Sequence, residues 1–478
     1  MDDSHKADLT SHPWFFCGIG GSGMLPLAQI LKGRGAQVAG SDRSCDQGRT
    51  PEKFAWLERE GFDLYPQDGS GITSAEQVLI ASAAVEDTVP EMVRARELGC
   101  SRMTRAELLS ELFNSSPFGI AVGGTSGKST VTGMLGWILA DIGADPTIMN
   151  GAVMKNFRST EAPFASAVVG SGQPFVSEVD ESDGSIALYR PKVGVLLNVS
   201  LDHKSIEELR ALFRNFLKAS ARTAVNFDDD ESYYLADGLD GVLPFAIDSR
   251  EALIKVEAGS IVEDPVSISA VVIDKRDKTA CPLHLAMPGR HNLSNALAAI
   301  AGANAAGVPV EDAVQALRSF KGMARRFDIV GTTGNNITVI DDFGHNPKKC
   351  AATLRAMRAH PGRVIAFFQP HGYGPLRQMG HELAETFARE LAADDVLILC
   401  DPVYFGGTVD RSEGSKRIIA MVREAAGDKP LDLHHIPARE DCGAKMVELA
   451  RPGDRIVIMG ARDDTLTDFA QGLFDQLG

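Results

Sequence analysis

The sequence has few cysteines, no long apolar run and no excess of positive charge, and each absence excludes a class of protein. Its seven cysteines are odd in number and form no C-x-x-C pair, so we expect neither a disulfide framework nor a zinc site. No apolar run approaches the roughly 18 residues of a membrane-spanning helix. The first residues lack the basic start and apolar core of a signal peptide, so we expect a cytoplasmic protein without a membrane span.

The charge balance limits the partners. The 48 Lys and Arg residues against 64 Asp and Glu residues give a net charge of −16. A protein that mainly binds a nucleic-acid backbone concentrates Lys and Arg, so we expect no nucleic-acid partner. The net charge does not exclude anionic small molecules as ligands, because they need only a local basic or amide-lined pocket. The composition is 44% hydrophobic and 23% charged, which is typical of a folded globular protein and favours an enzyme.

The length and the pattern of apolar segments predict three domains. At roughly 150 residues per domain, 478 residues suffice for about three. Short apolar strands alternate with helical segments along most of the chain, which predicts three consecutive α/β domains with parallel sheets. The pattern breaks at Asn114–Pro117 and again near Gly322–Arg326, so we place the domains at 1–116, 117–325 and 326–478. Short strands between Gly241 and Leu285 predict a small antiparallel insert in the central domain.

A glycine-rich loop follows the first predicted strand. Gly18-Ile-Gly20-Gly21-Ser22-Gly23 fits G-x-G-x-x-G between a strand at Trp14–Gly18 and a helix at Leu25–Lys32. Glycines let the backbone approach a diphosphate, which then lies at the helix N-terminus. Asp42 ends the next strand, where a carboxylate can accept a ribose hydroxyl. The loop predicts a nucleotide-diphosphate site but does not distinguish NAD from a nucleotide sugar, and a merely tight turn is the alternative.

A second glycine loop is the strongest single motif. Gly124-Thr-Ser-Gly127-Lys128-Ser129-Thr130 lies between a predicted strand and a predicted helix. It differs from the strict phosphate loop because Val122 replaces the first glycine. Its amides can nonetheless surround phosphate oxygens, Lys128 can reach the β and γ phosphates, and Ser129 or Thr130 can ligate Mg²⁺. We therefore expect nucleoside-triphosphate binding.

Polar residues at the ends of later strands form the remaining candidates. Glu178 and His203 each follow an apolar strand, and with the phosphate loop upstream we expect Glu178 to be a metal ligand. Asp180, Glu181 and Asp183 stay ambiguous, since a solvated acidic loop explains them equally. Further candidates lie at helix entries, at the second domain junction and after strands of the third domain: His291, Asn292, Asn295, Arg325, Arg326, Asp341, Asp342, His345 and His371.

The order of these motifs resembles the Mur ligase family. The series GIGGSG, GTSGKST, EVDESDGS, GRHNLSNALAA, FKGMARRFD, DDFGHNP and FQPH runs from about Trp14 to Gly460 in the expected order. The chain is most similar to the members that join L-alanine to UDP-N-acetylmuramate. The resemblance implies three domains: a Rossmann-like N-terminal domain, a P-loop-type central domain and a Rossmann-like C-terminal domain. It also implies a carboxylate–amine ligase of peptidoglycan precursor synthesis that depends on ATP and Mg²⁺.

The resemblance also implies roles for individual residues. The UDP-sugar would contact Gly18, Gly20, Gly21, Ser22, Gly23, Ser41, Asp42 and Ser82. ATP would contact Gly124, Thr125, Gly127, Lys128, Ser129, Thr130, His291, Asn292, Asn295, Arg326 and Asp342, and Mg²⁺ would contact Thr130, Glu178 and His203. Lys128 would stabilise the transferring phosphoryl group, Arg326 the tetrahedral oxyanion, and His345 would help to deprotonate the incoming amine.

Departures from the family pattern keep alternatives open. Ser126 stands where the phosphate loop usually has His, Asn346 replaces the second His of the usual H-H-P, and Gly372 replaces an arginine. Because of these changes, one alternative is a diverged ligase that acts on another amine or another carboxylate. A nicotinamide-dependent oxidoreductase explains only the first loop, and a non-catalytic nucleotide-binding paralogue is a fourth hypothesis. The sequence leaves the oligomeric state open.

Overall fold

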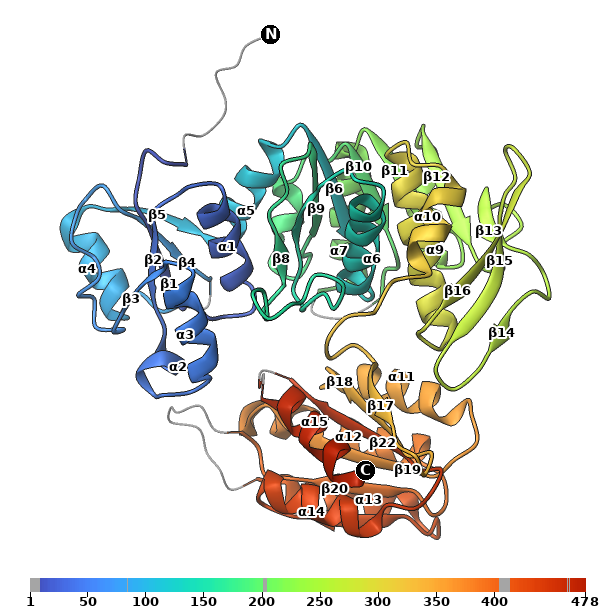
Figure 1. Ribbon diagram of the computed structural model, residues 1–478. Helices are drawn as coiled ribbons and strands as arrows, with labels where there is room; N and C mark the ends of the chain where they lie inside the picture. Colours follow the sequence, from blue (N-terminus) through green and yellow to red (C-terminus); the bar gives the residue numbers. More distant parts are fainter. Residues whose placement is uncertain (1–8, 84, 201–203, 404–412, 462, 464) are drawn as a thin grey trace. The chain divides into compact units, whose positions relative to one another are not determined.

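The computed structural model describes residues 9–83, 85–200, 204–403, 413–461, 463 and 465–478. The chain divides into two compact units. The first holds nearly all residues up to Gly322, and the second holds Met323–Gly478 together with the short segments Asp264–Ser267 and Met287–Gly289. Figure 1 shows α/β architecture in both, as the alternation of strands and helices predicts. Within the described residues, no helix combines the length and apolarity needed to cross a membrane.

The N-terminal segment is a parallel five-stranded sheet of order β3-β2-β1-β4-β5. β1 and β4 are buried throughout, because a parallel sheet has helices on its faces. Its strands are β1 Trp14–Cys17, β2 Val38–Ser41, β3 Asp63–Tyr65, β4 Val78–Ala81 and β5 Ser101–Thr104. Its helices are α1 Leu25–Gly33, α2 Arg43–Asp46, α3 Pro51–Arg59, α4 Pro90–Leu98 and α5 Arg105–Asn114.

The central segment is built on a larger sheet with the order β14-β15-β13-β12-β11-β10-β6-β9-β7-β8, in which β16 also pairs with β15. Its strands are β6 Phe118–Gly123, β7 Thr147–Met149, β8 Ala167–Val168, β9 Pro174–Glu178, β10 Val193–Leu196, β11 Arg222–Asn226, β12 Val242–Ala246, β13 Ile254–Val256, β14 Val262–Glu263, β15 Ile268–Asp274 and β16 Thr279–Leu285. Its helices are α6 Lys128–Asp141, α7 Ile206–Ala219, α8 Asp230–Ala236, α9 Arg290–Ala305 and α10 Val310–Leu317, with a short 3₁₀ turn, η1, at Ser185–Leu188.

The predicted antiparallel insert is smaller than the sequence pattern suggests. β12 and β13 extend the central sheet in parallel, and antiparallel pairing begins where β15 meets β13. The hairpin of β15 and β16 alternates buried and more exposed residues, as expected for strands with one face on the core. The antiparallel character is therefore confirmed for β14–β16, but it was assigned too early in the chain.

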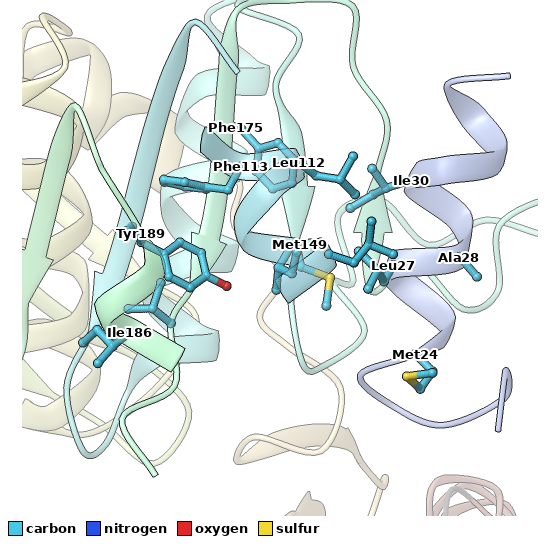
Figure 2. Close-up of a cluster of buried hydrophobic side chains, with 14 of the residues drawn as sticks. Met24, Leu27, Ala28, Ile30, Leu112, Phe113, Met149, Phe175, Ile186 and Tyr189 are labelled. Atoms are coloured by element: carbon cyan, nitrogen blue, oxygen red, sulfur yellow. The ribbon is translucent and has the colours of Figure 1, made fainter. Parts of the chain in front are cut away.

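The N-terminal and central segments share one hydrophobic core. Figure 2 shows Met24, Leu27 and Ile30, from α1 and the turn before it, facing side chains from α5 and the central sheet. Phe113 of α5 makes edge-to-face contacts with Phe175 of β9 and Tyr189, at centroid distances of 5.6 and 5.1 Å. Burial of this apolar surface holds the two segments, and hence their two glycine loops, in one compact unit.

The second unit contains a six-stranded sheet of order β17-β18-β22-β19-β20-β21, parallel except for the pair β17 and β18. Its central strands β19 and β22 are buried throughout. The strands are β17 Asp328–Thr332, β18 Thr338–Asp342, β19 Val364–Gln369, β20 Val396–Leu399, β21 Asp432–His435 and β22 Arg455–Gly460. The helices are α11 Pro347–Arg358, α12 Tyr373–Glu390, α13 Ser415–Ala426, α14 Arg439–Leu449 and α15 Leu466–Leu477.

Candidate active site

The loop Gly124–Thr130 joins β6 to α6 in a conformation that requires its glycines. Gly124 and Gly127 have φ values of 143° and 91°, in a region of backbone conformation that residues with a Cβ rarely adopt. A Cβ on Gly124 would lie 2.9 Å from the Cβ of Leu197, so the neighbouring strand also excludes a side chain. The glycines therefore set a tight turn between β6 and α6, as the sequence predicts, and phosphate binding by this turn stays a prediction.

Asn198, which follows β10, holds this loop at three points. The amide of Thr125 donates to the Asn198 carbonyl at 3.0 Å. The amide of Ser126 donates to Asn198 Oδ1, and Asn198 Nδ2 donates to the Ser126 carbonyl, each at 2.9 Å. The Asn198 side-chain amide thus forms the same pair of hydrogen bonds with the Ser126 backbone that a neighbouring strand would form. These bonds fix the loop before any nucleotide binds. Asn198 is not part of any of the sequence motifs.

Lys128 points back over the loop. Its Nζ donates to the Gly124 carbonyl and to Glu181 Oε2, both at 2.7 Å. The side chain of Glu181 is 6% exposed and that of Lys128 is 18% exposed, so the ion pair is mostly buried. A lysine in this position has its charge where the terminal phosphates of a nucleotide would lie. Of the ambiguous acidic residues, Glu181 is thus the one that contacts the lysine.

An oxygen-rich pair forms at the start of α6. Ser129 Oγ donates to Glu178 Oε2 at 2.8 Å, and the Ser129 carbonyl accepts from Asn150 Nδ2 at 2.9 Å. A hydroxyl beside a carboxylate is the donor set that Mg²⁺ prefers. The hydroxyl next to Glu178 belongs to Ser129, while the neighbouring Thr130 is buried. His203, the third predicted ligand, lies outside the described residues.

The N-terminal part of α9 reaches the same loop. A Cβ on Gly127 would lie 2.6 Å from Asn295 Oδ1, so the Asn295 amide packs directly on the loop. Asn292 is buried and His291 is exposed. Of the three residues predicted on this helix, the structure brings Asn295 against the phosphate loop.

The first glycine loop is braced by its own backbone and by Asp42. The amides of Gly18 and Ile19 donate to the Ser41 carbonyl, and the amide of Gly21 donates to the Gly18 carbonyl. The amide of Gly20 donates to Asp42 Oδ2 at 2.9 Å. The inner amides of the loop are therefore used within the protein, and Ser22 and Gly23 form its accessible end.

The residues predicted near the uridine lie at the carboxyl ends of β2 and β4. Asp42 Oδ1 also accepts from the amide of Ser44, which makes it the N-cap of α2. Ser41 is buried, and its hydroxyl donates to Glu91 Oε1 at 2.9 Å. Ser82 follows β4 and is partly exposed. Both Asp42 oxygens thus already have a structural role, and ribose contact by Asp42 stays a prediction.

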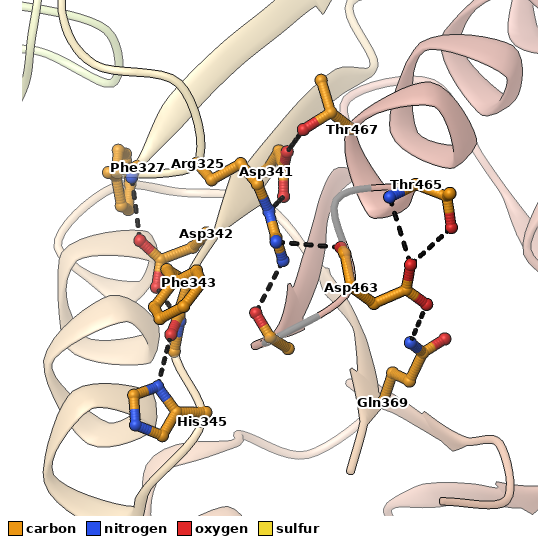
Figure 3. Close-up of polar contacts among 12 residues, drawn as sticks. Arg325, Phe327, Asp341, Asp342, Phe343, His345, Gln369, Asp463, Thr465 and Thr467 are labelled. Carbon is orange, nitrogen blue, oxygen red and sulfur yellow. Dashed lines mark hydrogen bonds and ion pairs between the residues drawn. The ribbon is translucent and has the colours of Figure 1, made fainter. Parts of the chain in front are cut away.

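In the second unit, the adjacent residues Arg325 and Arg326 have different environments, and Figure 3 shows the contacts of Arg325. Arg325 is buried and donates to the carbonyls of Asp463 and Gly460, and its Nε lies 3.5 Å from Asp341 Oδ1. Burial raises the pKa of Asp341 to about 6, although the nearby Arg325 opposes the shift. Arg326 is partly exposed, and its guanidinium lies 4.8 Å from the centre of the Phe343 ring. Arg325 is therefore structural, and Arg326 is the arginine that a ligand can reach.

Asp342 shapes the turn that carries His345. Its Oδ2 accepts from the amide of Phe327, while its Oδ1 accepts from the amide of Gly344 and from the hydroxyl of Thr353. These bonds satisfy the carboxylate within the protein. They tie β18 to the segment before β17 and to α11. A direct contact of Asp342 with ATP stays a prediction.

His345 is held as a neutral ring. Its Nδ1 lies 2.9 Å from the Phe343 carbonyl, which can only accept, so Nδ1 carries the proton and Nε2 is left as an acceptor. Burial lowers the pKa of His345 to about 4, and the charges of Lys349 and Arg326 add to the effect. His371 lies edge-on to this ring at 5.3 Å. A group with this pKa accepts a hydrogen bond well but is a weak base for an ammonium group.

Two of the departures from the family pattern, Asn346 and Gly372, lie in the second unit at the starts of α11 and α12. Asn346 is the N-cap of α11, where its Oδ1 accepts from the amide of Lys349 at 2.9 Å. Gly372 precedes α12 with a φ of 149°. Arg377 lies one turn into α12, with its Nε 3.9 Å from Glu413 Oε2. Asn346 has a helix-capping role, so its replacement of a histidine changes the chemistry of the turn without removing the turn itself.

Comparison with known proteins decides the family. Three family models match successive parts of the chain: the Mur ligase catalytic domain over residues 15–116, the Mur ligase middle domain over 122–303, and the Mur ligase glutamate ligase domain over 325–462. The chain belongs to the Mur ligase family. It is therefore an ATP-dependent ligase that forms an amide bond, and it has the three-domain fold of that family.

Individual relatives agree over nearly the whole length of this Mur ligase. It is 34% identical to a UDP-N-acetylmuramate–L-alanine ligase of Pelotomaculum thermopropionicum, over 94% of each chain. A protein of the same name from Agrobacterium fabrum is 33% identical, over 97% of this chain and 96% of the other. These identities extend the family assignment to all three segments.

Solved structures of the family show the same fold. A UDP-N-acetylmuramate–alanine ligase of Thermotoga maritima superposes with a TM-score of 0.76 at 23% identity, covering 97% of this chain and 99% of the other. A murein peptide ligase of Psychrobacter arcticus superposes with a TM-score of 0.70 at 23% identity, covering 98% and 99%. At such identities the likeness concerns the fold alone.

Proposed function

We propose that this Mur ligase joins L-alanine to the carboxyl group of UDP-N-acetylmuramate at the expense of ATP. The observation that carries the proposal is the cluster that Glu178 of β9 and Asn295 of α9 form with the phosphate loop of Lys128 and Ser129, in the compact unit that also holds the N-terminal glycine loop. One loop suits a nucleoside triphosphate and the other a nucleotide diphosphate. The names of the relatives supply the particular substrates.

The reaction overcomes the poor electrophilicity of a carboxylate. A carboxylate oxygen of the sugar attacks the γ-phosphorus of ATP, the bond to the β-γ bridging oxygen breaks, and ADP leaves. The amine of alanine then attacks the acyl carbon, inorganic phosphate leaves, and the amine proton passes to a base. Lys128 would stabilise the negative charge on the transferring phosphoryl group.

The metal site is assigned by donor chemistry. We propose that Ser129 and Glu178 hold Mg²⁺ with His203, and that Thr130 supports the same turn. The fit rests on the 2.8 Å pairing of the Ser129 hydroxyl with the Glu178 carboxylate, a hard-oxygen set. When bound, Mg²⁺ would neutralise charge on the phosphates. The amides of Gly127 and Lys128 would orient the nucleotide, while Asn198 holds Thr125 and Ser126 and Asn295 fixes the loop on α9.

The second unit would supply groups for the amine step. Arg326 has a reachable guanidinium and would hold the oxyanion that forms when the amine attacks. His345 would accept a hydrogen bond from the amine through Nε2 and so orient it. With a pKa of about 4, His345 is a weak base, so proton removal by solvent or phosphate fits better than removal by the histidine.

A second candidate function differs only in the amine. Gly372 and Asn346 alter the segments in which the resemblance places the acceptor, and a murein peptide ligase shares the fold. A Mur-type ligase that uses another amino acid or a peptide amine would keep the two phosphate loops unchanged. The two candidate functions share the ATP chemistry and differ in the amine that attacks the acyl phosphate.

Phosphate release tests both candidates. The full chain is incubated with UDP-N-acetylmuramate, MgATP and each amino acid or muropeptide-type amine in turn, and inorganic phosphate is measured. We expect release with L-alanine that Lys128→Ala abolishes, while Lys218→Ala on the exposed side of α7 leaves it unchanged. Efficient release with another amine alone supports the second candidate. Silence with every amine contradicts both.

A further inference from the structure

Arg105 contacts both the N-terminal glycine loop and the acidic segment that follows β9. It is the first residue of α5, whose start is fixed by a capping box between Thr104 and Glu107. A Cβ on Gly23, the last glycine of the N-terminal loop, would lie 3.1 Å from Cδ and from Nη1 of Arg105. The guanidinium therefore rests against the accessible end of that loop, where Gly23 leaves room for it.

The same guanidinium contacts the acidic segment that follows β9. Nη2 of Arg105 lies 3.7 Å from Asp183 Oδ2, and the two side chains are 28% and 33% exposed. Asp183 Oδ1 accepts from the amide of Ser185, which holds the carboxylate in place. Two residues earlier, Glu181 pairs with Lys128 of the phosphate loop. One short acidic segment thus pairs with a cation at each of the two loops.

Few amides of the N-terminal glycine loop are available to hold a diphosphate, although the Lys53 ammonium also lies at the loop, 3.3 Å from the Gly20 carbonyl. The amides of Gly18, Ile19, Gly20 and Gly21 already have acceptors within the protein. Within the described part of the chain, no hydrogen bond engages the amides of Ser22 and Gly23. Two amides leave much of a dianionic diphosphate without partners, whereas a guanidinium can bind phosphate oxygens through two parallel hydrogen bonds.

We propose that Arg105 binds the diphosphate of the nucleotide-sugar substrate and exchanges Asp183 for phosphate oxygens when that substrate enters. The assignment rests on the proposed function, because it takes the N-terminal loop as the nucleotide-sugar site. Arg105 is a substrate-binding residue that the sequence motifs do not reveal. The exposure of the ion pair lets the substrate reach the guanidinium.

Direct binding to the full-length protein tests the assignment without turnover. Titration calorimetry measures the affinity for UDP-N-acetylmuramate and, separately, for UDP, with thermal unfolding of each variant alongside. We expect Arg105→Ala to weaken both ligands about tenfold or more, since one charge-assisted hydrogen-bonding partner is lost, and Arg105→Lys to restore part of the loss. Asp183→Asn removes the competing charge, so it should bind both ligands as tightly as the parent protein or more tightly.

Controls separate the other outcomes. Arg102→Ala, on β5 and paired with Asp87, should leave both affinities unchanged. Equal binding by Arg105→Ala and the parent protein overturns the assignment, as does a loss for UDP-N-acetylmuramate that UDP does not share. Parallel losses of affinity and thermal stability in Arg105→Ala and Asp183→Asn would show a structural clamp instead. No binding by the parent protein overturns the proposed function and this assignment with it.

Discussion

Replacement of Glu181 by glutamine removes the charged partner of Lys128 and keeps the size of the side chain. At 2.7 Å and an effective dielectric constant of about 20, the Coulomb energy of the pair is about 6 kcal/mol, which is an upper limit. The cost of removing both ions from water offsets most of this energy. Because the pair is mostly buried and Lys128 keeps its bond to Gly124, we expect a net loss of about 2 kcal/mol.

The nucleotide changes this result in a way that identifies the role of the pair. Without nucleotide, Glu181→Gln should lower the unfolding temperature by about 3 °C. Saturating MgATP should remove most of the difference, since the phosphates then supply the negative partner of Lys128. Differential scanning fluorimetry with and without MgATP measures both values, with Glu111→Gln on the exposed face of α5 as control. A decrease that MgATP leaves unchanged, or no decrease at all, would show that the phosphates do not replace Glu181 as the partner of Lys128.

Three further predictions concern single residues. Since burial raises the pKa of Asp341 to about 6, its ionisation costs up to about 3 kcal/mol in the folded protein. As the pH rises from about 4 to about 6, the carboxyl group ionises more readily in the unfolded chain than in the folded one, so the parent protein should lose stability relative to Asp341→Asn. Unfolding temperatures of both proteins measured across this pH range test the sign, and a constant difference between them would contradict it. If His345 orients the amine, His345→Ala should lower kcat about tenfold and His345→Gln less. A drop of about a hundredfold or more in both variants would indicate a general base instead. Gly127→Ala places a Cβ 2.6 Å from Asn295 Oδ1 at a φ of 91°, so it should weaken MgATP binding about tenfold or more, and unchanged affinity by titration would refute the role of the loop.

Local signals predict much of the fold. Thr104 and Ser205 each begin an S/T-x-x-E sequence, and the structure has a capping box at both, at the starts of α5 and α7. Strand β4 is a single unbroken apolar run, Val78–Ala81, which is the local signal of a buried parallel strand. The helices α3 and α4 are not among the predicted elements, although each begins with a proline at its first turn, a signal for a helix start.

Local sequence patterns do not predict which distant strands pair, or in which direction. β12 and β13 are short and follow turn residues, so the sequence pattern resembles that of β14–β16, yet they continue the parallel sheet. The edge pairs of β7 with β8 and of β17 with β18 are antiparallel. A chain of α/β units gives no local sign of an antiparallel edge, because the partner strand sets the direction.

The motifs predict which loops form the site but not which side chains hold it. Gly124–Thr130 is recognisable from its glycines and from Lys128 alone. Asn198 and Glu181 reach the loop from the ends of other strands, and only the order of those strands in the sheet brings them there. Asp42 lies where the fingerprint predicts, but its carboxylate braces the loop itself, which a motif cannot distinguish from ligand binding.

Whether this Mur ligase attaches an amino acid to UDP-N-acetylmuramate is seen in the mass of the nucleotide-sugar product, after incubation of the full chain with UDP-N-acetylmuramate, MgATP and L-alanine. We expect a product heavier than the substrate by one alanine less one water, formed together with ADP, and absent with Lys128→Ala. Unchanged UDP-N-acetylmuramate, with alanine and every other amine tested, would contradict the proposed function.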